Sequence, residues 1–369
     1  MLVYFILIVL ILNLCIQYDL KQQRNIGKNV AFILLYLYLT LLIGLRYKVG
    51  GDTINYMQHW QWINDLSNWT FTFVAKYAPG YSFICSVCKT INHSFFFFQF
   101  IYCAIFNALL FIFVRKYTKY WFSSMFCIVY ICYLYFSTEI LRESLAVIIF
   151  SLAINSLLQK KLIKYYFSVF LAFLFHPSAI FLITLPIFSS LKFSRKYFII
   201  YILFCIGLII LKSQLHRIAG FPVIGPSLIP YMDENSQGYL ADFMSYLRLS
   251  LFPMLLVTFV KYNSKITSKY ETLIAILCLF GIGAYISPTI FQRFCNYFLL
   301  IEAVVYGDLF IECLKSTSSV TKKNITIFII SFILIYGSEY ILYDKYTRWI
   351  PYSSIYNPIE INRDNYNTK

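Results

Sequence analysis

The sequence is poor in charged residues, and this argues against a soluble protein. Only 13% of its 369 residues are charged and 60% are apolar, whereas soluble domains average about 25% charged residues. A water-soluble protein of this size would have to expose much of that apolar surface. Aromatic residues make up 20% of the chain, which excludes disorder because disordered segments are poor in them. The composition therefore indicates an integral membrane protein.

The sequence also lacks the signatures of several protein classes. It contains no Walker phosphate loop, no Gly-x-Gly-x-x-Gly, no His-Glu-x-x-His and no tandem repeat of fixed period. Cys85 and Cys88 form a Cys-x-x-Cys, but no second Cys or His pair completes a zinc site. The sequence thus lacks the usual signatures of ATP-driven transport and of zinc proteolysis, and we expect neither a metal nor another cofactor.

Long apolar runs are what the sequence does contain. A spanning helix needs about 20 apolar residues, with roughly 17 as the short end. Allowing for edges from the flanks, ten runs qualify: 2–18, 30–45, 94–114, 121–136, 143–158, 197–211, 244–260, 270–286, 294–314 and 324–343. No small-x-small cleavage site follows Cys15, so the first run is interpreted as a span rather than a signal peptide.

The run 161–190 is divided by His176-Pro177. One straight helix over this range would measure about 45 Å, beyond the roughly 30 Å hydrocarbon core. The alternative is a hairpin of two short helices that turns at the His-Pro step. With the hairpin, six segments with three Lys or Arg each, 18 of the 31 in the chain, fall on one side: 19–29, 115–120, 159–164, 191–196, 261–269 and 315–323.

Cytoplasmic loops of membrane proteins collect Lys and Arg, so the charge distribution favours the hairpin. The net charge of +15 then reflects orientation rather than a nucleic-acid partner. We expect an all-α, polytopic transmembrane helical bundle of about 12 spans, with residues 1–369 as one membrane domain. Both termini, loops at about 46–93 and 212–243, and a tail at 344–369 lie outside, and 79–91 forms a short re-entrant element.

The first outer polar segment covers residues 46–53. Gly50 and Gly51 allow a tight backbone and close approach of a ligand, and Asp52 offers a carboxylate. Arg46 stands at an outer helix end, against the usual charge bias. The segment is compatible with a ligand site and with an ordinary loop that carries a snorkelling arginine.

Two further outer segments carry charge or histidine. On a helix, Glu139 reaches Arg142 at i+3 and Glu143 at i+4, so the three share one face; they could form a site or an ion pair that joins two spans. His176 at the hairpin turn could act as a base, a proton relay, a phosphate donor or a simple helix cap. Arg248 follows the long outer loop, and could be a snorkelling anchor.

Arg293 lies at the outer end of the run 294–314, so four arginines, a histidine and several carboxylates map to one membrane face. Arginine presents a planar fork that binds phosphate oxygens in pairs and keeps its charge where water is scarce. Several arginines at one cavity imply a substrate with more than one negative charge, and a lipid diphosphate fits. If the diphosphate is the leaving group of the reaction, the arginines would stabilise the charge that builds on it in the transition state. A nearby carboxylate or histidine could deprotonate the attacking hydroxyl.

The order of these motifs resembles a known family. The motifs are Arg46 with Gly51-Asp52 and Tyr56, Leu141-Arg142-Glu143, Phe175-His176-Pro177-Ser178-Ala179, Gln292-Arg293-Phe294 and Arg348-Trp349-Ile350-Pro351-Tyr352. Over residues 30–352 this order is similar to the EpsG-type, Wzy-like polysaccharide polymerases of bacteria. Members often carry Gly-Thr-Asp where this chain has Gly50-Gly51-Asp52.

The resemblance implies a membrane glycosyltransferase of surface polysaccharide synthesis (capsule, exopolysaccharide or O-antigen). Such an enzyme moves a growing glycan from undecaprenyl diphosphate to the next lipid-linked repeat unit, on the outer face of the bacterial cytoplasmic membrane. It uses no cofactor or nucleic acid, lies among membrane lipids, and cooperates with a flippase and a chain-length regulator. The rival interpretations are a flippase or exporter of the same lipid-linked glycan, a membrane acyltransferase and a glycan ligase.

By matching position, the resemblance assigns Arg46, Asp52, Arg142, His176 and Arg293 to the site, and Gly51, Glu143 and Arg248 complete the eight expected residues. Arg142 and Arg293 would hold the diphosphate, and His176 or Asp52 would activate the acceptor hydroxyl. Substrate-binding residues would be Arg46, Gly51, Glu143 and Arg248, with Arg46 and Arg248 steering the anionic head groups.

Overall fold

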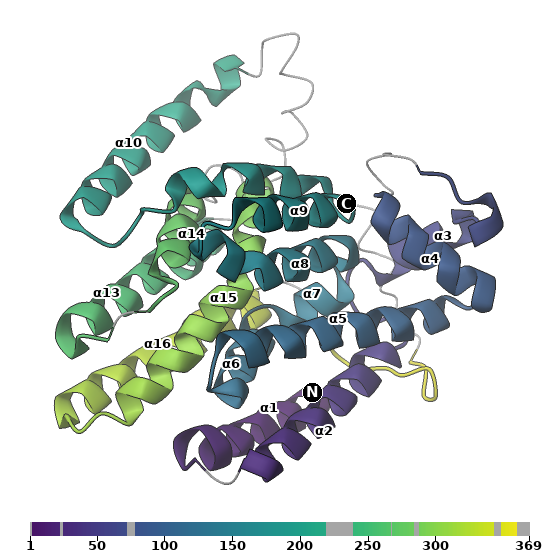
Figure 1. The fold of residues 1–369 in the computed structure, drawn as a ribbon, viewed down its shortest axis with the longest axis horizontal. Coiled ribbons are helices and arrows are strands. Elements are labelled where there is room, and N and C mark those ends of the chain that lie inside the picture. The colour runs from purple at the N-terminus through teal and green to yellow at the C-terminus, as the bar shows by residue number, and fades with distance from the viewer. Residues whose placement is uncertain are drawn as a thin grey trace.

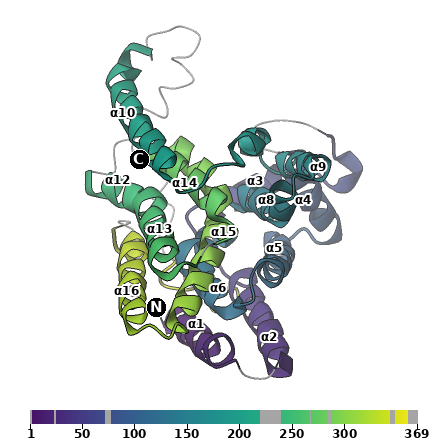
Figure 2. The ribbon, with the colours of Figure 1, turned by 60° about the vertical axis from the view of Figure 1, so that its left-hand side comes forward.

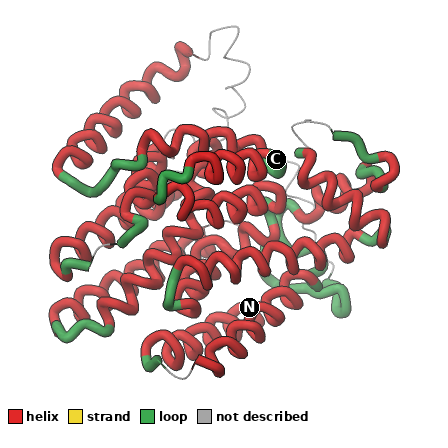
Figure 3. Tube along the Cα trace, in the orientation of Figure 1, coloured by secondary structure: helices red, strands yellow, loops and turns green. Residues whose placement is uncertain are grey.

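The computed structural model describes residues 2–22, 25–71, 78–218, 239–266, 268–283, 288–342 and 348–359. This part of the chain consists of helices and loops and contains no strand (Figure 3). Ser354 makes isolated β-bridges with Arg46 and Asn357. The prediction of an all-α fold is confirmed.

The N-terminal half contains residues 46–53 and the first set of helices. In chain order these are α1 (Leu2–Leu14), η1 (Cys15–Leu20), α2 (Asn25–Gly44), α3 (Thr53–Trp62), η2 (Leu66–Asn68), α4 (Pro79–Ile91), α5 (Phe95–Tyr117), α6 (Trp121–Ile128), η3 (Val129–Tyr133), α7 (Leu134–Thr138) and α8 (Leu141–Leu158). α6, η3 and α7 follow one another directly and form one helical stretch over residues 121–138.

The C-terminal half packs its helices beside α6 and α8. In chain order these are α9 (Leu162–Phe173), η4 (Pro177–Phe188), α10 (Arg195–Ile218), α12 (Tyr239–Tyr246), η5 (Leu247–Leu251), α13 (Phe252–Ser264), α14 (Glu271–Gly283), α15 (Pro288–Leu314) and α16 (Ser319–Leu342). α15 passes through the middle of the bundle and packs against α6, α8, α14 and α16. α10 lies at its edge in both views (Figures 1 and 2).

Among the described residues, seven helical stretches are long and apolar enough to cross a membrane: Leu2–Leu20, Ile26–Gly44, Phe95–Tyr117, Trp121–Thr138, Leu141–Leu158, Phe243–Ser264 and Ser319–Ser338. Three shorter apolar helices accompany them: α9, η4 and α14. Large apolar side chains on the outer faces of α1, α2 and α16 are exposed, as lipid-facing surfaces are. The protein is therefore membrane-embedded; the total of about 12 spans stays a prediction.

The run 161–190 breaks at His176 into two short helices, as the charge distribution predicts. Pro177 has no backbone N–H and forces the residue before it out of the helical region, and His176 is extended, with φ −152° and ψ 129°. α9 and η4 pack against each other. The Tyr165 hydroxyl on α9 donates to the carbonyl oxygen of Leu182 on η4, at 2.6 Å.

The basic segments lie together at one end of the bundle. Lys28 donates to the carbonyl oxygen of Lys119 (2.7 Å), and Lys119 pairs with Glu312 (3.1 Å). Lys116 donates to the carbonyl oxygen of Leu152 on α8 (2.9 Å). Segments far apart in the sequence are thus joined by lysines at the same end.

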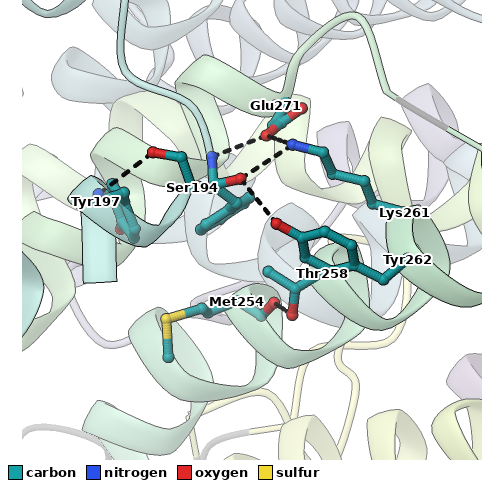
Figure 4. Close-up of polar contacts among 8 residues, drawn as sticks. Ser194, Tyr197, Met254, Thr258, Lys261, Tyr262 and Glu271 are labelled. Carbon is teal, nitrogen blue, oxygen red and sulfur yellow. Dashed lines mark hydrogen bonds and ion pairs between the residues drawn. The ribbon is translucent and has the colours of Figure 1, made fainter. Parts of the chain in front are cut away.

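A second set of contacts brings the loop after η4 to this end (Figure 4). Glu271 accepts a hydrogen bond from the backbone N–H of Phe193 (2.8 Å) and pairs with Lys261 (2.7 Å). Lys261 also donates to the carbonyl oxygen of Phe193 (3.0 Å). η4 therefore returns to the end from which α9 departs, as a hairpin requires.

The opposite end carries α3, α4 and residues 348–359 (Figure 1), and residues 348–359 are hydrogen bonded to the loop after α2. The expected re-entrant element 79–91 is α4, a helix that begins at Pro79; its entry into the membrane stays a prediction. Much of the expected outer loop 212–243 and part of the tail 344–369 lie outside the described residues.

Candidate active site

The loop after α2 is built around Arg46. This side chain is fully buried, and it donates from Nε to the carbonyl oxygen of Val49 (3.1 Å) and from Nη1 to that of Ile43 (2.8 Å). Gly50 has φ +106°, and a Cβ there would lie 2.7 Å from Cβ of Thr138. Arg46 therefore shapes the loop from within and does not face the surface.

Residues 348–359 hold this loop in place. The Gly50 N–H donates to the carbonyl oxygen of Arg348 (2.8 Å), and the Tyr47 N–H donates to that of Ser353 (2.9 Å). Arg348 pairs through Nη1 with Glu139 at 2.9 Å. A Cβ on Gly51 would lie 3.6 Å from Nε of Arg348. Gly51 therefore sits beside this ion pair, which was not predicted from the sequence although Arg348 belongs to the last of the five motifs.

Asp52 is exposed directly before α3, where it accepts a hydrogen bond from Asn55 (3.3 Å). One turn further along α3, the buried Tyr56 is hydrogen bonded to Arg142. Burial raises the pKa of Tyr56 to about 12, the Arg142 charge opposes this rise, and the Asp52 carboxylate adds to it. Tyr56 thus links the loop of Asp52 to the start of α8.

The start of α8 places a carboxylate between two arginines. Glu143 is 4% exposed and accepts a hydrogen bond from Asn296 on α15 (2.9 Å). Arg142 and Arg293 both interact electrostatically with this carboxylate. The first turn of α8 adds the positive end of the helix dipole. α8 and α15 together therefore form a positively charged surface that one buried carboxylate partly neutralises.

His176 lies at the same place. Its Nδ1 is 2.6 Å from Oγ of Ser178, which is 2.9 Å from the hydroxyl of Tyr297 on α15. Burial lowers the pKa of His176 to about 4, and the charges of Arg293 and Arg142 lower it further. The imidazole is therefore neutral at pH 7 and can accept a proton; an anionic substrate beside the arginines would raise its basicity.

Four of the eight expected residues thus converge: Arg142, Glu143, His176 and Arg293, named the histidine cluster below. Asp52 is connected to it through Tyr56. Arg142 also lines a small pocket with Tyr56, His59, Trp60, Ile63, Tyr81 and Phe98. Aromatic rings at such a position can stack on sugar rings.

Arg248 lies apart from this cluster, beside a small pocket of about 20 Å³. Its lining residues, which define the Arg248 pocket, are Ile131, Tyr135, Arg248, Leu249, Gln292, Leu299, Tyr336 and Trp349. Behind it, the fully buried Glu302 accepts hydrogen bonds from Tyr306 and Tyr336 (2.6 Å each) and interacts electrostatically with Arg248. Glu302 was not predicted from the sequence, although a carboxylate inside the apolar run 294–314 is a signal of function.

No group of three or more His, Cys, Asp or Glu in the described part of the chain could hold a metal ion. The arrangement can instead bind an anion with arginine and exchange a proton through an uncharged histidine.

Comparisons with known proteins give one result that covers most of the chain. The model of the EpsG family matches residues 29–354. No curated protein and no solved structure matches the chain. The chain belongs to the EpsG family.

Proposed function

We propose that this protein is a polymerase of surface polysaccharide in the bacterial cytoplasmic membrane. It transfers a nascent glycan from undecaprenyl diphosphate to a lipid-linked repeat unit, at the extracytoplasmic face. The observation that carries the proposal is the convergence of Arg142 and Glu143 on α8, His176 in the turn after α9, and Arg293 on α15. Family membership supports a polymerase of polysaccharide biosynthesis.

In the proposed reaction, a hydroxyl oxygen of the acceptor sugar attacks the anomeric carbon of the donor glycan. The bond between that carbon and the diphosphate oxygen breaks, and the glycosidic bond forms. The hydroxyl proton passes to His176, with Asp52 as the alternative base. The diphosphate leaves with the electron pair of the broken bond, and Arg142 and Arg293 stabilise its added charge.

The reaction needs a flippase that delivers repeat units to the outer face, and a chain-length regulator fits as a further partner. Membrane lipid surrounds the helices, and the long lipid tail of each carrier remains in the bilayer while its head group reaches the arginines. The arginine fork matches phosphate oxygens, and the presence of both Arg142 and Arg293 at one site favours a ligand with more than one negative charge, such as a diphosphate, over a single carboxylate.

Deletion of the gene, followed by analysis of lipid-linked glycans, tests the function. We expect single repeat units to accumulate and long polymer to disappear, with recovery when the gene is restored. Normal long chains after deletion would contradict the proposal, and repeat units trapped on the cytoplasmic side would indicate a flippase.

Variants of the restored gene test the site. We expect H176A to lower the yield of long polymer by roughly 10²–10⁴-fold, the usual contribution of a general base, and R293A to lower it by about 10²–10³-fold. H93A and R115A serve as matched controls, because His93 and Arg115 lie outside the histidine cluster. If His176 and Arg293 tolerate alanine at normal expression, the site assignment fails.

A further inference from the structure

A pocket of about 400 Å³ lies at the end of the bundle where the basic segments meet. It is lined by the end of α5, by the residues just before α14 and by the last part of α15. We name it the lysine pocket, after Lys116, Lys119 and Lys269 in its wall. Its volume falls within the range of about 300–1,000 Å³ that is usual for small-molecule sites. No residue of the histidine cluster lines it, so it is a separate site.

Two tyrosines hold the wall of the lysine pocket together. The hydroxyl of Tyr270 donates to the carbonyl oxygen of Tyr117 at 2.9 Å, and the two ring centroids lie 6.1 Å apart. Nζ of Lys269 lies 4.6 Å from the ring centroid of Tyr270, and Nζ of Lys116 lies 5.2 Å from that of Tyr117. Such contacts attract an ammonium group to the face of a ring. Both lysines are therefore held beside the wall instead of extending freely into water.

The charges of the pocket leave two lysines for a ligand. Of its two carboxylates, Glu312 pairs with Lys119 at 3.1 Å, and Asp308 accepts a hydrogen bond from a threonine hydroxyl. Within the part of the chain that the structure describes, neither Lys116 nor Lys269 forms an ion pair. Lys116 uses one of its three donors on a backbone carbonyl oxygen. The remaining donors of the two lysines suit an anion in the pocket.

The lysine pocket also lies at the depth of lipid head groups. One candidate span covers Phe95–Tyr117 and the next begins at Trp121, so the pocket stands where a span ends. Ile105, Ile112 and Lys116 are spaced at i, i+7 and i+11 on α5 and share one face. The two isoleucines are 37% and 55% exposed. An acyl chain can follow this apolar face into the bilayer while its head group reaches the lysines.

We propose that the lysine pocket binds the phosphate of an anionic phospholipid. Lys116 and Lys269 contact the phosphate oxygens, and the exposed face of α5 contacts the acyl chain. Basic pockets between membrane spans are typical sites for anionic head groups. Lysine binds phosphate as a point charge without the fixed fork of arginine, which suits a head group that exchanges with the surrounding lipid. The site takes no part in the proposed reaction, so its failure would leave that reaction standing.

The test is native mass spectrometry of the full chain, stripped of lipid in a non-ionic detergent, with phosphatidylglycerol or phosphatidylcholine added. We expect one phosphatidylglycerol to bind about thirtyfold more tightly than phosphatidylcholine, because each of two lysines contributes about fivefold for an anionic head group. Equal affinity for the two lipids would overturn the proposal. Glycerol 3-phosphate distinguishes the ligand source and should compete far more weakly than the lipid. Competition as strong as that of the lipid would overturn the lipid assignment in favour of a soluble phosphate ester.

Variants locate the bound lipid. We expect K116M with K269M to lower the affinity for phosphatidylglycerol by about thirtyfold, to that for phosphatidylcholine. K192M with K322M is the matched control, because Lys192 and Lys322 are exposed lysines of basic segments outside the pocket. E312Q should raise the affinity, by about fivefold, because it frees the lysine that this carboxylate pairs with. Lys116 and Lys269 are exposed, so their variant should fold, and its thermal midpoint without lipid verifies this. Unchanged affinity in that folded variant would overturn the proposal.

Discussion

At the scale of single residues, His176 determines a pH dependence of stability. Its pKa is lowered to about 4 in the folded protein, whereas an unfolded histidine has a pKa of about 6.5. Between these values the unfolded state binds more protons, so folded-state stability rises with pH. The contribution is complete above about pH 6.5 and is lost as the pH falls toward 4.

We therefore predict that the thermal midpoint of the wild type falls between pH 6.5 and 4 more steeply than that of H176Q. Thermal unfolding in detergent, followed by tryptophan fluorescence at several pH values, measures both slopes. Parallel curves would show that His176 is not buried in its neutral form. H93A should keep the wild-type slope, because the His93 side chain is exposed.

Gly50 and Gly51 form a second matched pair at this scale. Gly50 has a positive φ and no room for a Cβ beside Thr138, whereas the nearest atoms to a Cβ on Gly51 lie at 3.6 Å. We predict that G50A destabilises the protein by about 1–3 kcal/mol, the usual cost of such strain, and that G51A has a smaller effect. Thermal unfolding of both variants checks the order, and equal losses would contradict it.

At the scale of helices, α6 and α15 approach closely because Gly307 has no side chain. A Cβ on Gly307 would lie 2.7 Å from the backbone nitrogen of Ser124, whereas nothing lies within 4 Å of a Cβ on Gly207 in α10. We predict that G307A destabilises the protein by about 1–3 kcal/mol through overpacking. G207A is the control, and we expect it to be neutral or stabilising because alanine favours helices. A neutral G307A would mean that the two helices separate without cost.

Helices and their breaks follow largely from local sequence. The apolar runs predict most of the helices, and the His176-Pro177 step predicts the hairpin. The basic segments predict that the loops containing them lie at the same end of the bundle. The sequence also predicts Arg142, Glu143, His176 and Arg293 as site residues, because charged residues and a histidine at helix ends are conspicuous in an apolar chain. The distance between them was not predictable, since it depends on how α8, α9 and α15 pack.

Other features of the site depend on contacts between distant parts of the chain. Arg46 was expected to face head groups, but it is enclosed by the carbonyl oxygens of its own loop. The ion pair of Arg348 with Glu139 and the coupling of Glu302 to Arg248 join residues that no local pattern connects. A charged residue in an apolar sequence indicates that its side chain lies in a polar environment, but the sequence does not show which residue pairs with it.

At the scale of the whole molecule, the orientation in the membrane can be measured. The native cysteines are buried apart from Cys205, which is partly exposed. We predict that a membrane-impermeant maleimide applied to intact cells labels N68C and N357C, and that K192C is labelled only after the membrane is opened. Labelling of K192C from outside would contradict the hairpin at His176 and the proposed orientation together. The unsubstituted protein gives the background.

The contact between the loop after α2 and residues 348–359 has a consequence for biogenesis. Gly50 and Arg348 are separated by about 300 residues, which a ribosome adds in roughly 15–60 s at 5–20 residues per second. During that interval α1 and α2 can already be inserted, but their loop has no partner. The loop after α2 therefore gains this contact last, after α16 is made, and we expect a chain interrupted before residue 348 to be inserted with this loop unanchored.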